Sequence, residues 1–259
     1  MSQPETPPPL PPPLVSLVGA GPGDADLITV RGLKRLREAE VVIYDSLAGT
    51  DLLAHCAPDA ELISAGKRCG AHGAEQTQIN ALLVEKARAG LRVVRLKGGD
   101  PLVFGRGGEE ALALAEAGIA CEIIPGVTAA AAAAAAAQIP LTHRALSGGV
   151  LFLTGHESAK PADIATRVPW EQAGALPDVT LCIYMGVKNL PAIAARLLAG
   201  GMAAETPLAV VSKASLPDET VHETTVGAAA AGALDGEIET PALVLIGAVV
   251  RARPVPLKK

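Results

Sequence analysis

Aromatic side chains are scarce in this chain: its 259 residues include two Phe, two Tyr and one Trp. Any core must therefore be built mainly from Val, Leu, Ile and Ala, which are plentiful. The four cysteines, Cys56, Cys69, Cys121 and Cys182, are widely spaced and form no C-x-x-C pair. This spacing indicates neither a zinc site nor a redox pair, and it favours small apolar residues in a reducing cytoplasm.

Long apolar runs and a leader sequence are also lacking. The N-terminus has no basic segment followed by an apolar one, so the sequence predicts no signal peptide. The most apolar window, residues 123–141, is mostly alanine and contains two prolines, so we expect no membrane span. The net charge of −5 argues against a general nucleic-acid binder, which is usually basic. We therefore expect a cytoplasmic protein whose partners include neither a membrane nor a nucleic acid.

Well-known short catalytic motifs are missing as well. The sequence contains no Walker A motif, no G-x-S-x-G nucleophile elbow and no H-E-x-x-H zinc motif. Its five histidines, His55, His72, His143, His156 and His222, are not at metal-ligand spacing, which favours surface or hydrogen-bonding roles. We therefore expect no bound metal.

In the first half of the chain, short apolar runs alternate with segments of helical spacing. Thr29 is a suitable N-cap for the first helix, and Gly90 and Gly118 follow the later two. This alternation predicts an α/β fold with a mainly parallel sheet and helices on both faces. The expected strands are 14–18, 41–44, 61–64, 91–96 and 120–124, and the expected helices are 29–38, 75–89 and 109–117.

Nine consecutive alanines at 129–137 predict a further helix, because alanine is the strongest helix former. The alternation then restarts, with strands expected at 150–153, 180–185, 208–211 and 242–249 and helices at 190–198 and 225–234. The sequence thus predicts two α/β domains, each with a mainly parallel or mixed sheet, and a cleft where they meet. The expected order is a disordered Pro-rich tail (1–13), an N-terminal domain (14–139), a hinge (140–149), a C-terminal domain (150–251) and a tail (252–259).

Residues 95–110 carry the strongest functional signal. A strand-like run leads into a loop with five glycines, and Asp100 and Arg106 lie within that loop. Glycine lets backbone amides approach a ligand closely, and arginine presents a planar fork of donors that fits carboxylates. Because open α/β sheets bind ligands at the carboxyl ends of their strands, we expect a ligand site here.

A second glycine-rich turn, residues 19–23 (GAGPG), follows the first strand. Asp45 lies at the end of the next strand, where a ribose-binding acid would stand in a dinucleotide site. However, the third glycine comes too early for G-x-G-x-x-G, and Pro22 removes an amide that a pyrophosphate would need. A nicotinamide-dependent oxidoreductase is therefore a weaker alternative, which predicts NAD binding and no response to a methyl donor.

A series of motifs runs in order from about residue 14 to residue 250. They are 15–24 (VSLVGAGPGD), 27–29 (LIT), 39–47 (AEVVIYDSL), 66–68 (GKR), 78–80 (QIN), 94–110 (VRLKGGDPLVFGRGGEE), 124–130 (IPGVTAA), 139–144 (IPLTHR), 154–156 (TGH), 184–186 (YMG) and 241–247 (PALVLIG). Together these motifs resemble those of the tetrapyrrole methylases. The GGDPxxFGRGGEE and IPLTHR segments favour the branch of that family that acts on uroporphyrinogen III.

The resemblance implies a two-domain fold that holds S-adenosylmethionine (SAM) in the interdomain cleft, and a homodimer of two such chains. It also implies two successive methylations of uroporphyrinogen III, at ring carbons 2 and 7, through precorrin-1 to precorrin-2. Each methylation releases S-adenosylhomocysteine (SAH), so the expected cofactor is SAM and no metal is required. The product serves sirohaem, cobalamin or related biosynthesis.

By the same resemblance, the SAM contacts fall largely on small residues whose backbone can touch the adenine and methionine moieties. Asp100 either pairs with the cationic amine of SAM or accepts its ribose hydroxyls, and the sequence leaves both open. The implied set is Pro22, Gly98, Gly99, Asp100, Val103, Thr128, Ala129, Met185, Ala214 and Ala242.

The implied substrate carries eight carboxylates and needs cations around it. Arg106 and Arg144 are the leading candidates, with Lys67 and Arg68 as secondary ones and Met185 as a further contact. An ordinary surface ion pair is the competing explanation for each of the four charged residues.

Arg106, Asp45 and Glu109 are the predicted catalytic residues. Arg106 is expected to act electrostatically, because its very high pKa makes a free arginine a poor base. Glu109 follows one helical turn later and is expected to orient Arg106, whereas Asp45 is expected to hydrogen-bond pyrrole N–H groups.

Other functions on the same fold stay open. A sibling methylase acting on a later corrin intermediate is the nearest, followed by a diphthamide or ribosomal-RNA methylase, although RNA binding favours a more basic surface. A non-catalytic module that binds SAM or a tetrapyrrole is a third class, against which the presence of Asp100 and Arg106 argues.

Overall fold

The computed structural model describes residues 14–65, 72–156, 168–234 and 238–254, and its contacts divide the chain into two compact units. Unit 1 comprises Met1–Ala20 and Ile28–Gly126, and unit 2 comprises Gly21–Leu27 and Val127–Lys259. This division differs from the predicted hinge at 140–149. The alanine-rich helix accounts for the difference, because it packs on the strands of unit 2 rather than on those of unit 1.

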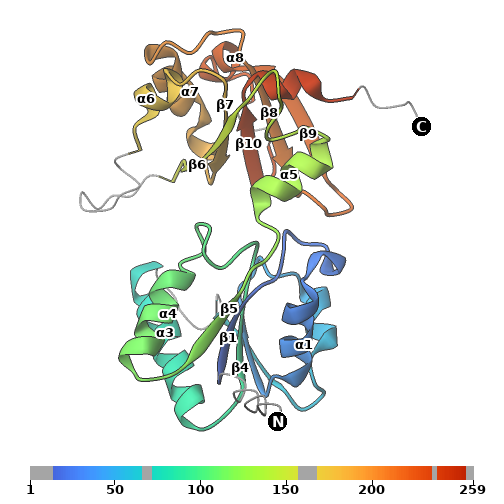
Figure 1. The fold of residues 1–259 in the computed structure, drawn as a ribbon, viewed down its shortest axis with the longest axis vertical. Helices are drawn as coiled ribbons and strands as arrows, with labels where there is room; N and C mark the ends of the chain where they lie inside the picture. The colour runs from blue at the N-terminus through green and yellow to red at the C-terminus, as the bar shows by residue number, and fades with distance from the viewer. Residues whose placement is uncertain (1–13, 66–71, 157–167, 235–237, 255–259) are drawn as a thin grey trace, which may run out of the picture. The chain divides into compact units, whose positions relative to one another are not determined.

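Unit 1 is a parallel sheet with helices on both faces, as predicted (Figure 1). Its five strands lie in the order β3-β2-β4-β1-β5, and every neighbouring pair is parallel. All five carboxyl ends therefore meet along one edge. The elements are β1 (Val15–Gly19), α1 (Val30–Glu38), β2 (Val41–Tyr44), η2 (Thr50–His55), β3 (Glu61–Ser64), α3 (His72–Arg88), β4 (Val93–Lys97), α4 (Gly107–Glu116) and β5 (Cys121–Ile124).

Alternating strand residues cover the two faces of this sheet. Leu17 and Ile43 belong to a buried cluster that includes residues of α3 and α4. Val18 faces the other way, where a Cβ on Gly32 of α1 would lie 2.9 Å from it. The predicted N-cap is confirmed, since the Thr29 hydroxyl accepts a 3.1 Å hydrogen bond from the Gly32 amide.

Unit 2 contains a mixed sheet with the strand order β6-β7-β10-β8-β9. The strands β6, β7 and β8 run in one direction, and β9 and β10 run in the other. Its elements are η1 (Ala25–Leu27), α5 (Ala129–Ala137), β6 (Gly149–Thr154), α6 (Trp170–Gly174), β7 (Val179–Tyr184), η4 (Val187–Asn189), α7 (Leu190–Ala199), β8 (Pro207–Ser212), β9 (Thr220–Thr225), α8 (Val226–Ala230), β10 (Ala242–Ile246) and η5 (Ala248–Ala252).

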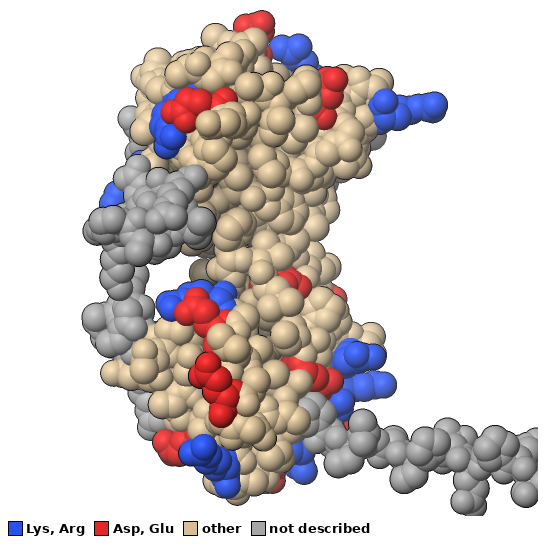
Figure 2. All heavy atoms as spheres, turned by 60° about the vertical axis from the view of Figure 1, so that its left-hand side comes forward, with Lys and Arg blue, Asp and Glu red and all other residues tan. Residues whose placement is uncertain are grey.

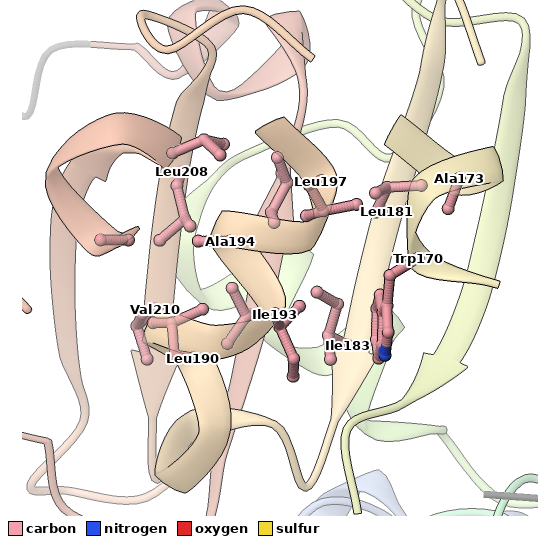
Figure 3. Packing of buried hydrophobic residues seen from close by; sticks show 14 residues of the cluster. Trp170, Ala173, Leu181, Ile183, Leu190, Ile193, Ala194, Leu197, Leu208 and Val210 are labelled. Carbon is pink, nitrogen blue, oxygen red and sulfur yellow. The ribbon is translucent and has the colours of Figure 1, made fainter. Parts of the chain in front are cut away.

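Figure 3 shows the core of unit 2 on the face covered by α6, α7 and α8. Trp170, the chain's single tryptophan, packs here beside Ile183, while Leu190 and Ile193 of α7 contact the strands. The opposite face of the sheet receives α5, which contacts β8 and β10. The nine alanines form one helix with the predicted bounds. Their small side chains let it lie close to the sheet, and five of them are buried.

Four parts of unit 2 differ from the sequence prediction. The edge strand β9 and the short helix α6 were not expected, and the helix predicted at 225–234 is shortened to α8. The strand predicted at 242–249 ends at Ile246, because Gly247 has a φ of 142° and turns the chain into η5. The apolar residues Val249 and Val250 are buried from that 3-10 helix rather than from a strand.

Charged side chains on the face drawn in Figure 2 form small groups in which Lys or Arg borders Asp or Glu. Ion pairs such as Arg196–Glu171, at 2.7 Å, have this mixed character. Among the described residues, no helix is long and apolar enough to cross a membrane.

Candidate functional site

Three strand ends of unit 1 come unusually close together. A Cβ built on Gly126, which follows β5, would lie 2.2 Å from the Gly99 carbonyl oxygen and 2.8 Å from the Gly19 Cα. Any side chain here would collide with backbone, so only glycine fits at the point where β1, β4 and β5 end. The result is a glycine cradle, formed by Gly19, Gly99 and Gly126, at the carboxyl edge of the parallel sheet.

Asp100 ties the cradle together. Its Oδ1 accepts a hydrogen bond from the Leu102 amide at 2.8 Å, and its Oδ2 accepts one from the Gly126 amide at 3.1 Å. Each carboxylate oxygen keeps a lone pair for a further donor. The neighbouring Gly98 and the half-buried Val103 lie on the same loop. The predicted SAM residues of unit 1 are thus brought together at one edge.

Arg106 and Glu109 lie at the start of α4, directly after this loop. The Arg106 guanidinium donates two hydrogen bonds to the Glu109 carboxylate, at 2.9 and 2.8 Å, so the predicted contact between them is present. Both side chains are exposed, at 47% and 55%. Arg106 has a left-handed φ of 59°, and Phe104 has a φ of 52°. Strained backbone of this kind concentrates at functional sites.

A buried group of charges lies beneath this edge, and we call it the Arg95 cluster: Asp45, Gln76, Arg95, Lys97 and Glu110. Arg95 contacts Asp45 at 2.5 Å and Glu110 at 3.0 Å, while Lys97 contacts Glu110 at 3.0 Å. Gln76 donates to Glu110 at 3.2 Å. Asp45, the predicted partner of pyrrole N–H groups, is the one carboxylate of the cluster that reaches the surface, at 32% exposure.

The charges of the cluster perturb one another. Burial lowers the pKa of Lys97, and the neighbouring Arg95 lowers it further, so the net pKa lies below the ordinary value. Burial also opposes the charge of Arg95, but Asp45 and Glu110 outweigh it and raise the pKa of the guanidinium. Arg95 therefore stays fully charged although it is 2% exposed.

Sequence reasoning missed Arg95, Lys97 and Glu110 as site residues. The sequence did contain a signal for a buried charge cluster. Arg95 and Lys97 occupy alternate positions of one strand, and helices are predicted to cover both faces of that strand's sheet. Two cations on such a strand require buried carboxylate partners. Glu110, in the first turn of α4, is the buried carboxylate that meets both cations in the structure.

A second set of predicted residues gathers along one edge of the unit 2 sheet. Met185 follows β7 with a φ of 54°, and Ala214 lies two residues beyond β8. Ala242 begins the antiparallel strand β10 and pairs with Ser212 of β8, and the next residue of β10, Leu243, pairs with Tyr184. Three predicted SAM contacts that are distant in sequence therefore lie on neighbouring strands at the same edge.

Tyr184 joins the start of α5 to this edge. Its hydroxyl is 2.7 Å from the Thr128 hydroxyl and accepts a hydrogen bond from the Ala130 amide at 3.1 Å. Thr128 and Ala129, both predicted SAM contacts, are thereby fixed beside β7. Tyr184 was not predicted as a site residue, although it precedes Met185 directly.

The loop that carries Pro22 also packs within unit 2. The Asp24 amide donates to the Ser215 hydroxyl at 3.2 Å, and a Cβ on Gly23 would lie 2.7 Å from the Leu216 side chain. Pro22 is thus held near Ala214, one residue before Ser215. Six of the predicted SAM contacts therefore belong to unit 2: Pro22, Thr128, Ala129, Met185, Ala214 and Ala242.

The remaining predicted substrate residues are more dispersed. Arg144 is exposed in a turn of unit 2, near a bridge between His143 and Ser147. Lys67 and Arg68 lie outside the described residues. Within the described part of the chain, no group of His, Cys, Asp or Glu is arranged to hold a metal ion. The placement of the active site in an interdomain cleft stays a prediction.

The chain is similar to known proteins over most of its length. A family model described as Tetrapyrrole (Corrin/Porphyrin) Methylases matches residues 14–230. A uroporphyrinogen-III C-methyltransferase from Sinorhizobium sp. is 46% identical over 239 residues, which cover 92% of this chain and 84% of the relative. A siroheme synthase from Pseudomonas putida is also 46% identical over 92% of this chain, but this covers 50% of the relative. The chain thus spans about half the length of the siroheme synthases it matches.

Two solved structures extend the comparison to the fold. The uroporphyrin-III C-methyl transferase from Thermus thermophilus, complexed with S-adenyl homocysteine, has a TM-score of 0.75 and 41% identity, and the match covers 92% of this chain and 99% of that one. The cobalt precorrin-4 methyltransferase CbiF has a TM-score of 0.80 and 32% identity, and the match covers 93% of this chain and 99% of that one. The predicted fold class is confirmed, and the chain belongs to the tetrapyrrole methylase family.

Proposed function

We propose that this chain is a SAM-dependent C-methyltransferase that converts uroporphyrinogen III to precorrin-2 through precorrin-1, by methylation at C2 and then C7. The observation that carries the proposal is the near-complete match to the Sinorhizobium and Thermus enzymes together with the exposed Arg106–Glu109 pair beside a glycine cradle. The match to siroheme synthases supports the same step and covers about half of their length.

The residues of the cradle fit SAM. The Cβ positions of Gly98 and Gly126 are filled by neighbouring protein atoms, so these residues pack tightly at the strand ends. We propose that the backbone amides and carbonyls of this loop contact the adenine or the methionine chain. The half-buried Asp100 retains acceptor capacity after its two backbone hydrogen bonds, so it can bind ribose hydroxyls or the ammonium group. We propose that the small residues of unit 2, among them Thr128 and Met185, complete the cofactor site.

When bound, SAM supplies an electrophilic methyl group, and the pyrrole carbons of the substrate are electron-rich. The protein then has mainly to align the two reactants, which supplies several kcal/mol of the barrier reduction. Arg106 and Arg144 bind substrate carboxylates, and we assign the same role to Lys67 and Arg68. Asp45 accepts hydrogen bonds from pyrrole N–H groups. Glu109 holds the Arg106 fork in one orientation.

A sibling activity on a later corrin intermediate is the second candidate, because the precorrin-4 enzyme matches this fold with a TM-score of 0.80. Incubating the full chain with SAM and uroporphyrinogen III, followed by mass spectrometry, separates the two. Two added methyl groups support the first proposal. A folded protein that binds SAH and adds no methyl group to uroporphyrinogen III supports the sibling.

The role of Arg106 has its own test. Arg106→Ala should abolish methylation and leave SAH affinity within about twofold of wild type by calorimetry. Arg196→Ala is a matched control, because Arg196 forms the same two-bond pair with Glu171 and its side chain is 46% exposed. Full turnover by Arg106→Ala would remove this residue from the site. The family also implies a cytoplasmic location and a homodimer. Sedimentation of the purified chain would test the homodimer.

A further inference from the structure

The Arg95 cluster contains charges that the proposed reaction does not use directly. The side chains of Arg95, Lys97 and Glu110 are 2%, 3% and 0% exposed, so none of them can touch a bound tetrapyrrole. Buried ion pairs contribute little to stability, since well-packed apolar residues of similar volume often do as well or better. The cluster therefore calls for an explanation other than stability.

Arg95 is fixed on several sides. Its Nε donates to Glu110 Oε1 at 3.0 Å, and one terminal nitrogen donates to Asp45 Oδ1 at 2.5 Å. The other terminal nitrogen donates to the Ile43 carbonyl at 3.3 Å, on the strand that leads into Asp45. The guanidinium plane thus bridges β2, β4 and α4, and it has little freedom to rotate.

Glu110 anchors the buried end of this bridge. Its Oε1 receives hydrogen bonds from Arg95, from Lys97 at 3.0 Å and from Gln76 at 3.2 Å. Three donors on one oxygen hold the carboxylate in place, while Oε2 has no hydrogen-bond partner among the described residues. Lys97 also lies 4.0 Å from Asp45 Oδ2. The surface end of the bridge is Asp45 alone.

We propose that Arg95 is a positioning residue, anchored by Glu110 and Lys97, that holds the Asp45 carboxylate in the orientation that engages the tetrapyrrole. The inference rests on the proposed function, because it concerns the residue assigned to the pyrrole N–H groups. A planar fork directs separate hydrogen bonds to two carboxylates and fixes their orientation, whereas the ammonium of a lysine acts as a point charge, as Lys97 does at 3.0 Å from Glu110 and 4.0 Å from Asp45. Arg95 thus acts through Asp45 and not on the substrate.

A double-mutant cycle on the full chain tests this. Arg95→Lys keeps the charge and should lower kcat by about 10- to 100-fold, the range expected for a misplaced catalytic group. KM and the SAH affinity should change by less than about twofold. In the Asp45→Asn background, the same Arg95→Lys change should lower kcat by less than about twofold, because the residue it positions is already altered.

A second variant covers the case in which Arg95→Lys does not fold. Glu110→Gln is nearly isosteric and weakens the anchor without removing it. It should lower kcat in the same direction, and this loss should also disappear in the Asp45→Asn background. Arg35→Lys is the control, because Arg35 bridges two carboxylates as well, Glu38 and Glu122, and lies away from Asp45 at the amino end of the sheet. It should keep kcat within about twofold.

The outcomes separate the two levels of the argument. Equal losses from Arg95→Lys in both backgrounds, or full activity of Asp45→Asn or of either cluster variant, would overturn the positioning role while wild-type methylation stands. Wild-type protein that adds no methyl group to uroporphyrinogen III would overturn the proposed function and this inference with it.

Discussion

Replacing Gly126 with alanine tests the glycine cradle directly. The new Cβ would lie 2.2 Å from the Gly99 carbonyl oxygen, whereas ordinary contacts begin at 3.4 Å, so the backbone must open by about 1.2 Å. No side chain can rotate to absorb this, because the nearest atoms all belong to the Gly99 and Gly19 backbones. The Gly126 amide would also be displaced from Asp100, which now accepts its hydrogen bond at 3.1 Å.

The expected magnitudes follow from that displacement. Overpacking of this kind costs about 1–3 kcal/mol, which corresponds to a fall in Tm of about 2–12 °C for a chain of this size. A shift of about 1 Å in the Gly98–Asp100 loop should lower kcat/KM by about 100-fold. Differential scanning calorimetry measures the first effect, and calorimetric SAH titration together with product mass spectrometry measures the second.

Gly108→Ala is the matched control for this experiment. A Cβ on Gly108 meets no atom within 4 Å, and the residue lies in the helix α4 of the same unit. Alanine there should stabilise the protein by about 0.5–1 kcal/mol and leave SAH binding unchanged. If Gly126→Ala behaved like Gly108→Ala in both stability and SAH affinity, neither the close backbone approach nor the cofactor role of this edge could stand.

Two further variants test other parts of the structure. Tyr184→Phe removes the acceptor of the buried Ala130 amide, so the free energy of unfolding in urea should fall by about 1–3 kcal/mol and SAH should bind more weakly. Tyr44→Phe is the control, because the Tyr44 hydroxyl has no hydrogen bond among the described residues. It should change neither quantity. An unchanged SAH affinity in Tyr184→Phe would separate this tyrosine from the site. Burial raises the pKa of Glu122, but hydrogen bonds from Arg35 and Ser16 outweigh it and leave the pKa below 4.5. The ionised carboxylate therefore stabilises the fold fully above pH 4.5 and loses this effect as the pH falls through the lower native pKa. Glu122→Gln should flatten the dependence of the urea-unfolding free energy on pH in this acidic range, and it should lower that free energy at pH 7 by up to about 1 kcal/mol. An unchanged dependence on pH would contradict the role given to Glu122.

The elements that were predicted well share a local cause. Thr29 caps α1, and the alanine run ends at α5's observed last residue, because capping and helix propensity act within a few residues. The strand β9 was missed because Thr220–Thr225 is mostly polar and half exposed, so its register is given by pairing with β8 and not by an apolar pattern of its own. The overlong β10 prediction has the opposite cause, an apolar run that continues past the turn at Gly247.

The Arg95 cluster marks the limit of local reasoning in unit 1. Arg95 and Lys97 alternate along one strand and so share a face, but the sequence alone does not show that Gln76 and Glu110 meet that face. Only the packing of α3 and α4 over β4 identifies Gln76 and Glu110 as the partners of these two cations. The contacts of the cluster join residues up to 50 positions apart, for which no local pattern exists.

The two sheets also explain which site residues physical reasoning could reach. In the parallel sheet of unit 1, every carboxyl end falls on one edge, so a loop after any strand is a candidate, and Asp45 and Asp100 follow from that rule. In the mixed sheet of unit 2, β10 runs against β7 and β8, so the edge that carries Met185 and Ala214 meets the amino end of β10. A rule based on carboxyl ends would have sought a contact after Ile246, at the opposite edge from Ala242. The family resemblance was therefore the only route to Ala242, whereas strand direction already pointed to the Asp100 loop of unit 1.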